Sequence, residues 1–211
     1  MQTSMNVPLK VGATLVMLEK WDAQAAARLI QTHRVTGWRN ITTMIKDFVE
    51  LPNIGAFDLS SLRAIGGGGA AVPATLYERI REVTGLPYIE GFGMTETMAA
   101  THMNPADASR PGSIGRLVKG VDCLVISMEA DLPLPAGDKG ELVVAGPQLF
   151  RGYLGRDDET DRAHIQIDGK RYFRTGDIGH ADEDGYYFIT DRRKRMINVA
   201  GLKSGLRKSS R

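Results

Sequence analysis

The sequence predicts an α/β protein, with an αβ layer followed by a small β-barrel-like unit. Through about residue 100, short apolar runs alternate with helical patterns, which is typical of parallel strands joined by helices. Beyond Arg110, short apolar runs are separated by Gly, Pro and Asp turns, which favours an antiparallel sheet or small barrel. We therefore expect an αβ unit at 1–115, a β-rich unit at 116–190 and a short further segment at 191–211.

The first half should contain three helices and two short strands. Asp22 can cap the first helix, Pro73 introduces the third, and Gly85 ends it. The expected helices are Ala23–His33, Ile41–Val49 and Ala74–Thr84. The expected strands are Val11–Leu18, as a buried strand, and Leu62–Ile65. Val11–Leu18 is far shorter than the ~20 residues that cross a bilayer, so no membrane-spanning segment is expected.

The second half should contain several antiparallel strands. Leu124–Ile126, Glu141–Val144 and Tyr186–Ile189 are short apolar runs. Pro135–Asp138 and Asp182–Gly185 have turn composition and separate them.

Composition argues for a small-molecule partner. The 211 residues carry 27 basic and 25 acidic side chains, a net charge of +2, so no overall field favours nucleic acid or an anionic membrane. The basic stretch from Arg192 onward has no interleaved aromatic residues, so we expect a solvated tail. The single cysteine, Cys123, cannot form an internal disulfide and lies in an apolar run, which predicts a buried structural thiol and a cytoplasmic location.

Four consecutive glycines, Gly66–Gly69, follow a strand candidate and precede a helix. Without Cβ atoms, this backbone could approach a flat ring or a phosphate. A flexible turn is an equally good interpretation, because the run lacks the Gly-Lys-Ser/Thr ending of a phosphate-binding P-loop.

The segment Tyr88–Thr97 is more informative. Gly91 and Gly93 flank Phe92, so the ring could present a face to a planar ligand. Thr95 offers a hydroxyl and Glu96 a carboxylate, a pair that suits a phosphate and its magnesium counter-ion. The alternative is a strand end with a buried Phe and a Thr-Glu helix cap.

Two further positions could contact a nucleotide. Gly176 should make a turn, after which the Asp177 carboxylate could accept hydrogen bonds from a ribose diol. Arg192 could reach a ribose or a phosphate. The alternative for Asp177 is a capped turn, and the alternative for Arg192 is a solvated loop.

Taken together and in this order, these segments resemble the adenylate-forming superfamily of acyl-CoA synthetases, luciferases and peptide-synthetase adenylation domains. Gly68-Gly69-Ala70 is similar to its adenine-binding loop, and Gly91-Phe92-Gly93-Met94-Thr95-Glu96 to its most recognisable motif. The resemblance runs from about Pro8 to Lys203 and is strongest to fatty-acyl and related CoA ligases.

The resemblance implies a two-step reaction. A carboxylate, expected to be a fatty acid, attacks the α-phosphate of ATP to give an acyl-adenylate, and the CoA thiol then displaces AMP. ATP or AMP, Mg²⁺ and CoA are the implied ligands. Phe92 would stack on adenine, Thr95 would contact the α-phosphate, and Glu96 would hold magnesium, which makes Thr95 and Glu96 the catalytic pair. Asp177 and Arg192 would bind the ribose.

The remaining implied positions complete the site. Lys194 would be the hinge about which a C-terminal domain rotates, and Gly201 would line the CoA channel. The pocket walls should come from the regions 38–44 and 93–98. The nucleotide-binding set implied by the resemblance is Gly68, Gly69, Ala70, Glu90, Gly91, Phe92, Gly93, Thr95, Asp177 and Arg192.

Two departures from the family pattern matter. No Ser/Thr/Gly-rich phosphate loop precedes residue 66, and after Lys203 the pattern gives way before the lysine that assists adenylation. We therefore expect an incomplete large N-terminal domain, with 191–211 as the hinge and the start of a missing C-terminal domain. This chain alone should bind AMP at most weakly and should not turn over. A non-catalytic binding or regulatory domain, and part of a carrier-protein-loading adenylation domain, remain the alternatives.

Overall fold

The computed structural model describes residues 2–69, 72–192, 196–199 and 202–205. The implied sites at Ala70, Lys194 and Gly201 lie outside the described residues. The helical elements are η1 (Gln2–Asn6), α1 (Val7–Lys10), α2 (Ala23–His33), α3 (Thr42–Val49), η2 (Ile54–Ala56), α4 (Ala74–Thr84), η3 (Thr95–Thr97) and α5 (Asp157–Arg162). The strands are β1 (Gly37–Ile41), β2 (Ala64–Gly68), β3 (Tyr88–Gly93), β4 (Ala100–Met103), β5 (Arg116–Leu117), β6 (Asp122–Ile126), β7 (Gly140–Ala145), β8 (His164–Ile167), β9 (Lys170–Ala181), β10 (Tyr187–Arg192), β11 (Met196–Val199) and β12 (Leu202–Gly205).

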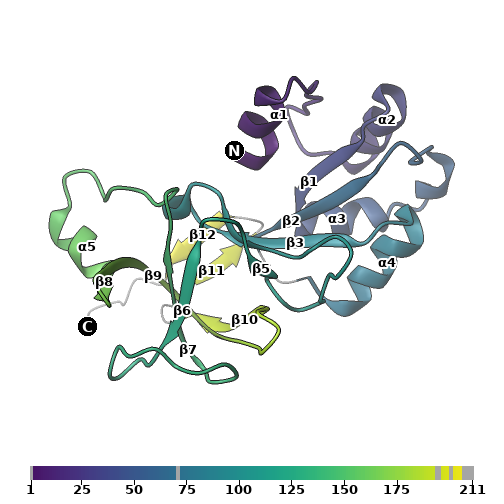
Figure 1. Ribbon diagram of the computed structural model, residues 1–211. Helices are drawn as coiled ribbons and strands as arrows, with labels where there is room; N and C mark the ends of the chain where they lie inside the picture. The colour runs from purple at the N-terminus through teal and green to yellow at the C-terminus, as the bar shows by residue number, and fades with distance from the viewer. Residues whose placement is uncertain (1, 70–71, 193–195, 200–201, 206–211) are drawn as a thin grey trace, which may run out of the picture.

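The first half is a sheet of order β1-β2-β3-β4-β5 that carries the helices α2, α3 and α4 beside it (Figure 1). Strands β1, β2 and β3 are parallel, and β4 and β5 continue the sheet in antiparallel fashion. Phe48 of α3, Ile80 of α4 and Tyr88 of β3 are fully buried in the shared core. The predicted α/β class with parallel strands is confirmed.

Capping residues set where α2 begins and where α4 ends. The Asp22 carboxylate accepts the Ala25 N–H at 2.6 Å and caps α2, and Gly85 ends α4 with φ +71°. Both helices match their predicted bounds. Helix α3 begins one residue later than predicted, because Ile41 is the last residue of β1.

The prediction of a buried strand at Val11–Leu18 is wrong. The segment follows α1 as a turn and irregular chain, with Val11 73% and Met17 76% exposed. An apolar run forms a strand only where a neighbouring strand can pair with it, and within the described residues none pairs with this segment.

The glycine run also differs from the prediction. Strand β2 extends through Gly68 rather than ending before the glycines: Gly66 and Gly67 pair with both neighbouring strands, and Gly68 pairs with β1. Gly69 alone in the run has a positive φ, +98°. The strand expected at Leu62–Ile65 therefore begins and ends further along the chain.

The second half is an antiparallel sheet of order β10-β9-β7-β6, with β8 on β9 (Figure 1). Every residue of the central strand β7 is buried, and Cys123 on β6 is buried as predicted, where burial raises the pKa of its thiol. Gly176 does not make a turn between strands. It has φ +71° inside β9, where the register between β7 and β9 shifts.

Backbone hydrogen bonds join the two halves. Tyr187 of β10 accepts the Ile114 N–H at 2.9 Å and donates its own N–H to Gly115 at 3.0 Å. The unit boundaries at 115 and 190 stay a prediction. No helix in the described part of the chain combines the length and the apolar character needed to cross a membrane.

Candidate functional site

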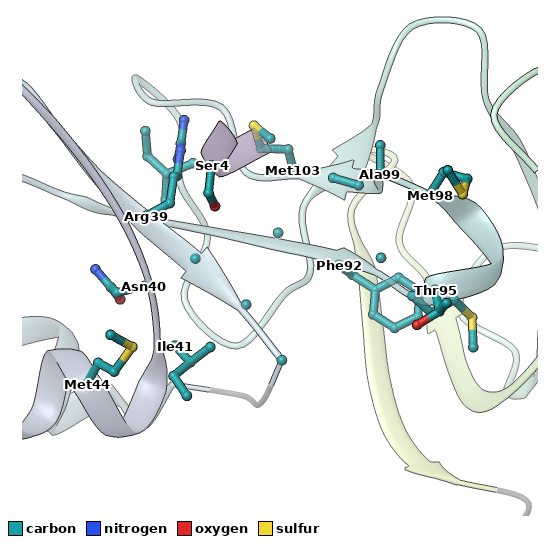
Figure 2. A pocket seen from close by; sticks show the side chains of 18 of the residues that line it. Ser4, Arg39, Asn40, Ile41, Met44, Phe92, Thr95, Met98, Ala99 and Met103 are labelled. Carbon is teal, nitrogen blue, oxygen red and sulfur yellow. The ribbon is translucent and has the colours of Figure 1, made fainter. Parts of the chain in front are cut away.

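A cavity of about 800 Å³ lies where the parallel strands β1, β2 and β3 end (Figure 2). The carboxyl edge of parallel strands is the usual ligand-binding edge of an α/β sheet. The regions expected to form pocket walls, 38–44 and 93–98, both contribute to its lining. The lining residues are Ser4, Asn6, Arg39, Asn40, Ile41, Met44, Gly67, Gly68, Gly69, Ile89, Gly91, Phe92, Gly93, Met94, Thr95, Met98, Ala99, Ala100 and Met103.

The cavity floor depends on Gly67 having no side chain. The Tyr88 hydroxyl on β3 donates a hydrogen bond to Asn40 Oδ1 on β1 at 2.9 Å, so the bond crosses the intervening strand β2. A Cβ at Gly67 would lie 1.8 Å from the Asn40 carbonyl oxygen and 2.7 Å from the Tyr88 hydroxyl. The glycine run is therefore required by packing as well as being available to a ligand.

Phe92 presents a half-buried ring at the opposite wall from Asn40 and Met44 (Figure 2). Its neighbours Gly91 and Gly93 also line the cavity and leave its face uncrowded. The ring packs against the core of the second sheet and lies 5.9 Å from the His102 ring. This combination of an anchored ring and bare backbone suits a flat heterocycle.

His102 supports Phe92 from behind. It is fully buried between Phe92 and Tyr187, whose ring centroid is 4.6 Å away, and its Nδ1 is 2.9 Å from the Thr101 hydroxyl. Burial lowers the pKa of His102 to about 3, so the imidazole is neutral at physiological pH.

The short helix η3 places Thr95 at the cavity rim. The Thr97 hydroxyl oxygen accepts the Met94 N–H at 2.9 Å, which fixes the turn, and Thr97 is fully buried. Thr95 remains exposed, so its hydroxyl is available to a ligand.

Glu96 is half-buried and is absent from the cavity lining. Its carboxylate accepts the Tyr153 hydroxyl at 3.0 Å, and its backbone carbonyl accepts the Phe150 N–H at 2.8 Å. Burial first, then the Glu96 carboxylate, raises the pKa of Tyr153 to about 12, so this hydroxyl stays protonated.

A single carboxylate is a suitable donor set for magnesium in a phosphate site, because Mg²⁺ keeps several waters and takes its other ligands from the phosphates. Among the described residues, no group of three His, Cys, Asp or Glu side chains could hold a metal by itself. Glu96 therefore fits magnesium as a partner shared with a phosphate.

Glu90 lies away from the cavity lining. Its buried carboxylate accepts the Tyr77 hydroxyl at 2.8 Å and the Val72 N–H, so it contacts α4 and the loop before it. Burial raises its pKa. Alternation in the first part of β3 explains the placement, since Ile89 and Gly91 line the cavity; the alternation stops at Phe92, where the pairing with β4 shifts register.

Asp177 and Arg192 form a two-point ion pair across β9 and β10. The Arg192 Nε and Nη2 both donate to the carboxylate, Nη2 at 3.2 Å. Asp177 is almost completely buried, and neither residue is among the lining residues of the cavity. The structure therefore gathers Gly68, Gly69, Phe92 and Thr95 at one cavity, and places Glu90, Glu96, Asp177 and Arg192 outside its lining.

Sequence reasoning assigned no site role to Tyr153, Ile89 or Met103. Tyr153 reaches Glu96 over a separation of 57 residues, and no local pattern marks such a contact. The alternation of apolar residues along β3 could have indicated Ile89.

A glycine-lined cavity with an anchored aromatic ring at the carboxyl edge of parallel strands is typical of α/β proteins that bind a flat ligand such as a nucleotide. A model of the family described as AMP-binding enzyme matches residues 1–154, and the chain belongs to this family. Its fold is that of the N-terminal domain of adenylate-forming enzymes.

Two relatives and one solved structure agree with membership of this family. The chain is 32% identical over 198 residues to the long-chain-fatty-acid–CoA ligase of Bacillus subtilis (strain 168), covering 93% of this chain and 35% of the ligase. It is 36% identical over 194 residues to a feruloyl-CoA synthase of Amycolatopsis sp, covering 90% and 38%. The structure of ATP-bound MatB from Rhodopseudomonas palustris superposes with a TM-score of 0.81 at 30% identity, covering 95% of this chain and 39% of MatB. The chain thus spans little more than a third of the length of these proteins.

Proposed function

We propose that this chain carries the adenylate-binding residues of an AMP-forming acid–CoA ligase. The observation that carries the proposal is that Gly68, Gly69, Phe92 and Thr95 all line one cavity. A flat ring can lie between the glycine backbone and the Phe92 face, while the Thr95 hydroxyl lies within the same cavity for a phosphate.

The residues divide the work of the first step, in which a carboxylate oxygen bonds to the α-phosphorus of ATP and pyrophosphate leaves. Phe92 orients the adenine, and the Thr95 hydroxyl donates to an α-phosphate oxygen. Asp177 and Arg192 are proposed to bind the ribose hydroxyls after their ion pair opens toward the cavity, because in the structure Arg192 engages both carboxylate oxygens and Asp177 is buried. Glu96 holds magnesium, which when bound neutralises phosphate charge. Positioning and charge neutralisation are the main catalytic effects expected at phosphorus.

In the second step, the CoA thiol bonds to the acyl carbon and AMP leaves. The acid is proposed to be a fatty acid or a related apolar acid, because Ile41, Met44, Met98 and Met103 give the cavity apolar walls. The names of two relatives, a fatty-acid ligase and a feruloyl-CoA synthase, support both aliphatic and aromatic acids.

For this chain by itself, we propose adenylate binding with little thioester formation. Among the described residues that line the cavity, Arg39 is the one cation, and three phosphates need more than one positive partner. The same observation favours the second candidate function, a domain that binds adenylate without catalysis.

Isothermal calorimetry tests the proposal. The folded chain is titrated with AMP and with a non-hydrolysable acyl-sulfamoyl adenosine, and we expect both to bind at one site, the acyl compound more tightly because it also contacts the apolar walls. No heat of binding from a folded sample would contradict the proposal. A thioester assay with ATP, CoA and either dodecanoate or ferulate should give little product from this chain, and robust product would contradict the proposal that the chain by itself binds adenylate without efficient turnover.

A further inference from the structure

The loop at residues 150–153 of the second half reaches across to η3 of the first half. Two hydrogen bonds bind it to one residue: the Phe150 N–H donates to the Glu96 carbonyl at 2.8 Å, and the Tyr153 hydroxyl donates to Glu96 Oε1 at 3.0 Å. Backbone and side chain of Glu96 are therefore held by the same loop.

This loop is itself held at several points. The Tyr153 N–H donates to the Thr160 hydroxyl of α5 at 2.9 Å, and a Cβ at Gly152 would lie 2.6 Å from Thr160 Cγ2. The Phe150 ring packs edge-on against Tyr153 at 4.8 Å and against Phe173 at 5.4 Å. The Tyr153 hydroxyl is thus positioned before any ligand arrives.

A carboxylate that accepts a hydrogen bond on one oxygen loses rotational freedom and keeps the other oxygen for a cation. In the part of the chain that the structure describes, the Tyr153 hydroxyl is the hydrogen-bond donor to this carboxylate, and it engages Oε1. Groups that orient a metal ligand from behind typically change metal affinity by about 10–100-fold when removed.

We propose that Tyr153 is a positioning residue that fixes the Glu96 carboxylate for the cation of the nucleotide complex. The inference rests on the proposed function, because it takes Glu96 as the group that meets the cation. It assigns to the second half a part in the phosphate site, with α5 holding the loop through Thr160.

The test measures Mn²⁺, used in place of Mg²⁺, by electron paramagnetic resonance of the free ion with one equivalent of non-hydrolysable ATP analogue per chain, after subtraction of the Mn²⁺ that the analogue binds without protein. Tyr153→Phe removes the hydroxyl and keeps the ring, and we expect Mn²⁺ affinity to fall about tenfold. Thr160→Val should give a smaller loss, and Glu96→Gln a larger one. Tyr172→Phe is the matched control: its hydroxyl donates to Asp122 at 2.6 Å in another hydrophobic cluster, and its loss should leave Mn²⁺ affinity unchanged.

Two results would contradict the role proposed for Tyr153. Equal Mn²⁺ affinities of the wild type and Tyr153→Phe would overturn the inference, as would a wild-type chain that binds AMP but no Mn²⁺. AMP calorimetry on the same samples keeps the proposed function separate, because a chain that binds AMP normally yet shows no Tyr153 effect fails only the inference. Thermal melting identifies any variant that has lost its fold. If Tyr153→Phe has lost its fold, the Mn²⁺ affinity of Thr160→Val tests the inference in its place.

Discussion

At the scale of single residues, the cavity depends on side chains that are fixed before a ligand enters. Phe92 is anchored on His102 and on the core of the second sheet, and Thr95 projects from a turn that Thr97 fixes. The ligand therefore need not order these groups, and the free energy of binding is not spent on their conformational entropy.

Phe92→Ala should weaken AMP binding about tenfold or more, because stacking on a base contributes ~1–3 kcal/mol. Phe92→Tyr, which keeps the ring, should bind AMP like the wild type. Calorimetry at one temperature measures both variants. If Phe92→Ala bound AMP as tightly as the wild type, adenine would not stack on this ring.

Gly67→Ala should destabilise the chain by about 1–3 kcal/mol, the usual cost of overpacking. The added methyl would meet the backbone carbonyl of Asn40 and the Tyr88 hydroxyl, which donates across β2 to the Asn40 side chain. Gly55→Ala is the matched control, since nothing lies within 4 Å of its Cβ position. Urea unfolding measures both, and equal free energies of unfolding would show that β2 tolerates a side chain there.

At the scale of elements, strand pairing decides what local patterns could not. The motif at Tyr88–Thr97 and the bounds of α2 and α4 follow from short-range signals: flanking glycines, an Asp cap and a Gly end. The prediction of a strand at Val11–Leu18 was wrong because a strand needs a neighbouring strand to pair with, and an apolar run does not reveal whether such a partner is present. Gly176 was predicted to make a turn, but its positive φ lies inside β9 at a register shift, and glycine is suited to both places.

Strands β9 and β10 hold a buried ion pair whose loss should be costly. In Arg192→Ala, the Asp177 charge, 1% exposed, would lose a guanidinium that is itself only 26% exposed, so we expect a loss of about 3 kcal/mol. The control is Arg34→Ala, whose pair with Asp58 is 63% and 50% exposed and should contribute less than about 1 kcal/mol. Urea unfolding compares the two, and equal losses would contradict a buried role for the Asp177 pair.

Strand β4 should give the chain an acid-sensitive stability. The folded pKa of His102, about 3, lies below its ordinary value of 6.5, so the unfolded chain binds more protons between these values. The stability from neutral His102 is full above pH 6.5 and is lost as pH falls toward 3.

His102→Phe should therefore lose less melting temperature between pH 7 and pH 5 than the wild type, whereas a substitution of the exposed His33 by Gln should leave that difference unchanged. Thermal melts at the two pH values provide the measurement. If the melting temperature fell equally in His102→Phe and in the wild type between pH 7 and pH 5, burial of this imidazole would not govern the acid sensitivity of the fold.

At the scale of the whole molecule, the candidate site draws on both sheets. The first sheet supplies the cavity, and the second half supplies Tyr153, whose hydroxyl binds Glu96. The Asp177–Arg192 pair, which we propose for the ribose, lies in the second sheet outside the cavity lining. The α/β class and the cavity residues that belong to sequence motifs could be predicted, because the spacing of glycine and aromatic residues is visible within a short stretch of sequence. The contacts between halves could not, because Tyr153 and Glu96 meet only through the packing of distant segments.

The central claim is that adenylate binds at the carboxyl edge of β1, β2 and β3, and photolabelling with 8-azido-AMP tests it most directly. After irradiation and digestion, mass spectrometry should find the label on peptides that contain Gly66–Gly69 or Tyr88–Met103, and excess AMP should suppress it. Labelling at other peptides, or labelling at these peptides that excess AMP does not reduce, would contradict the account.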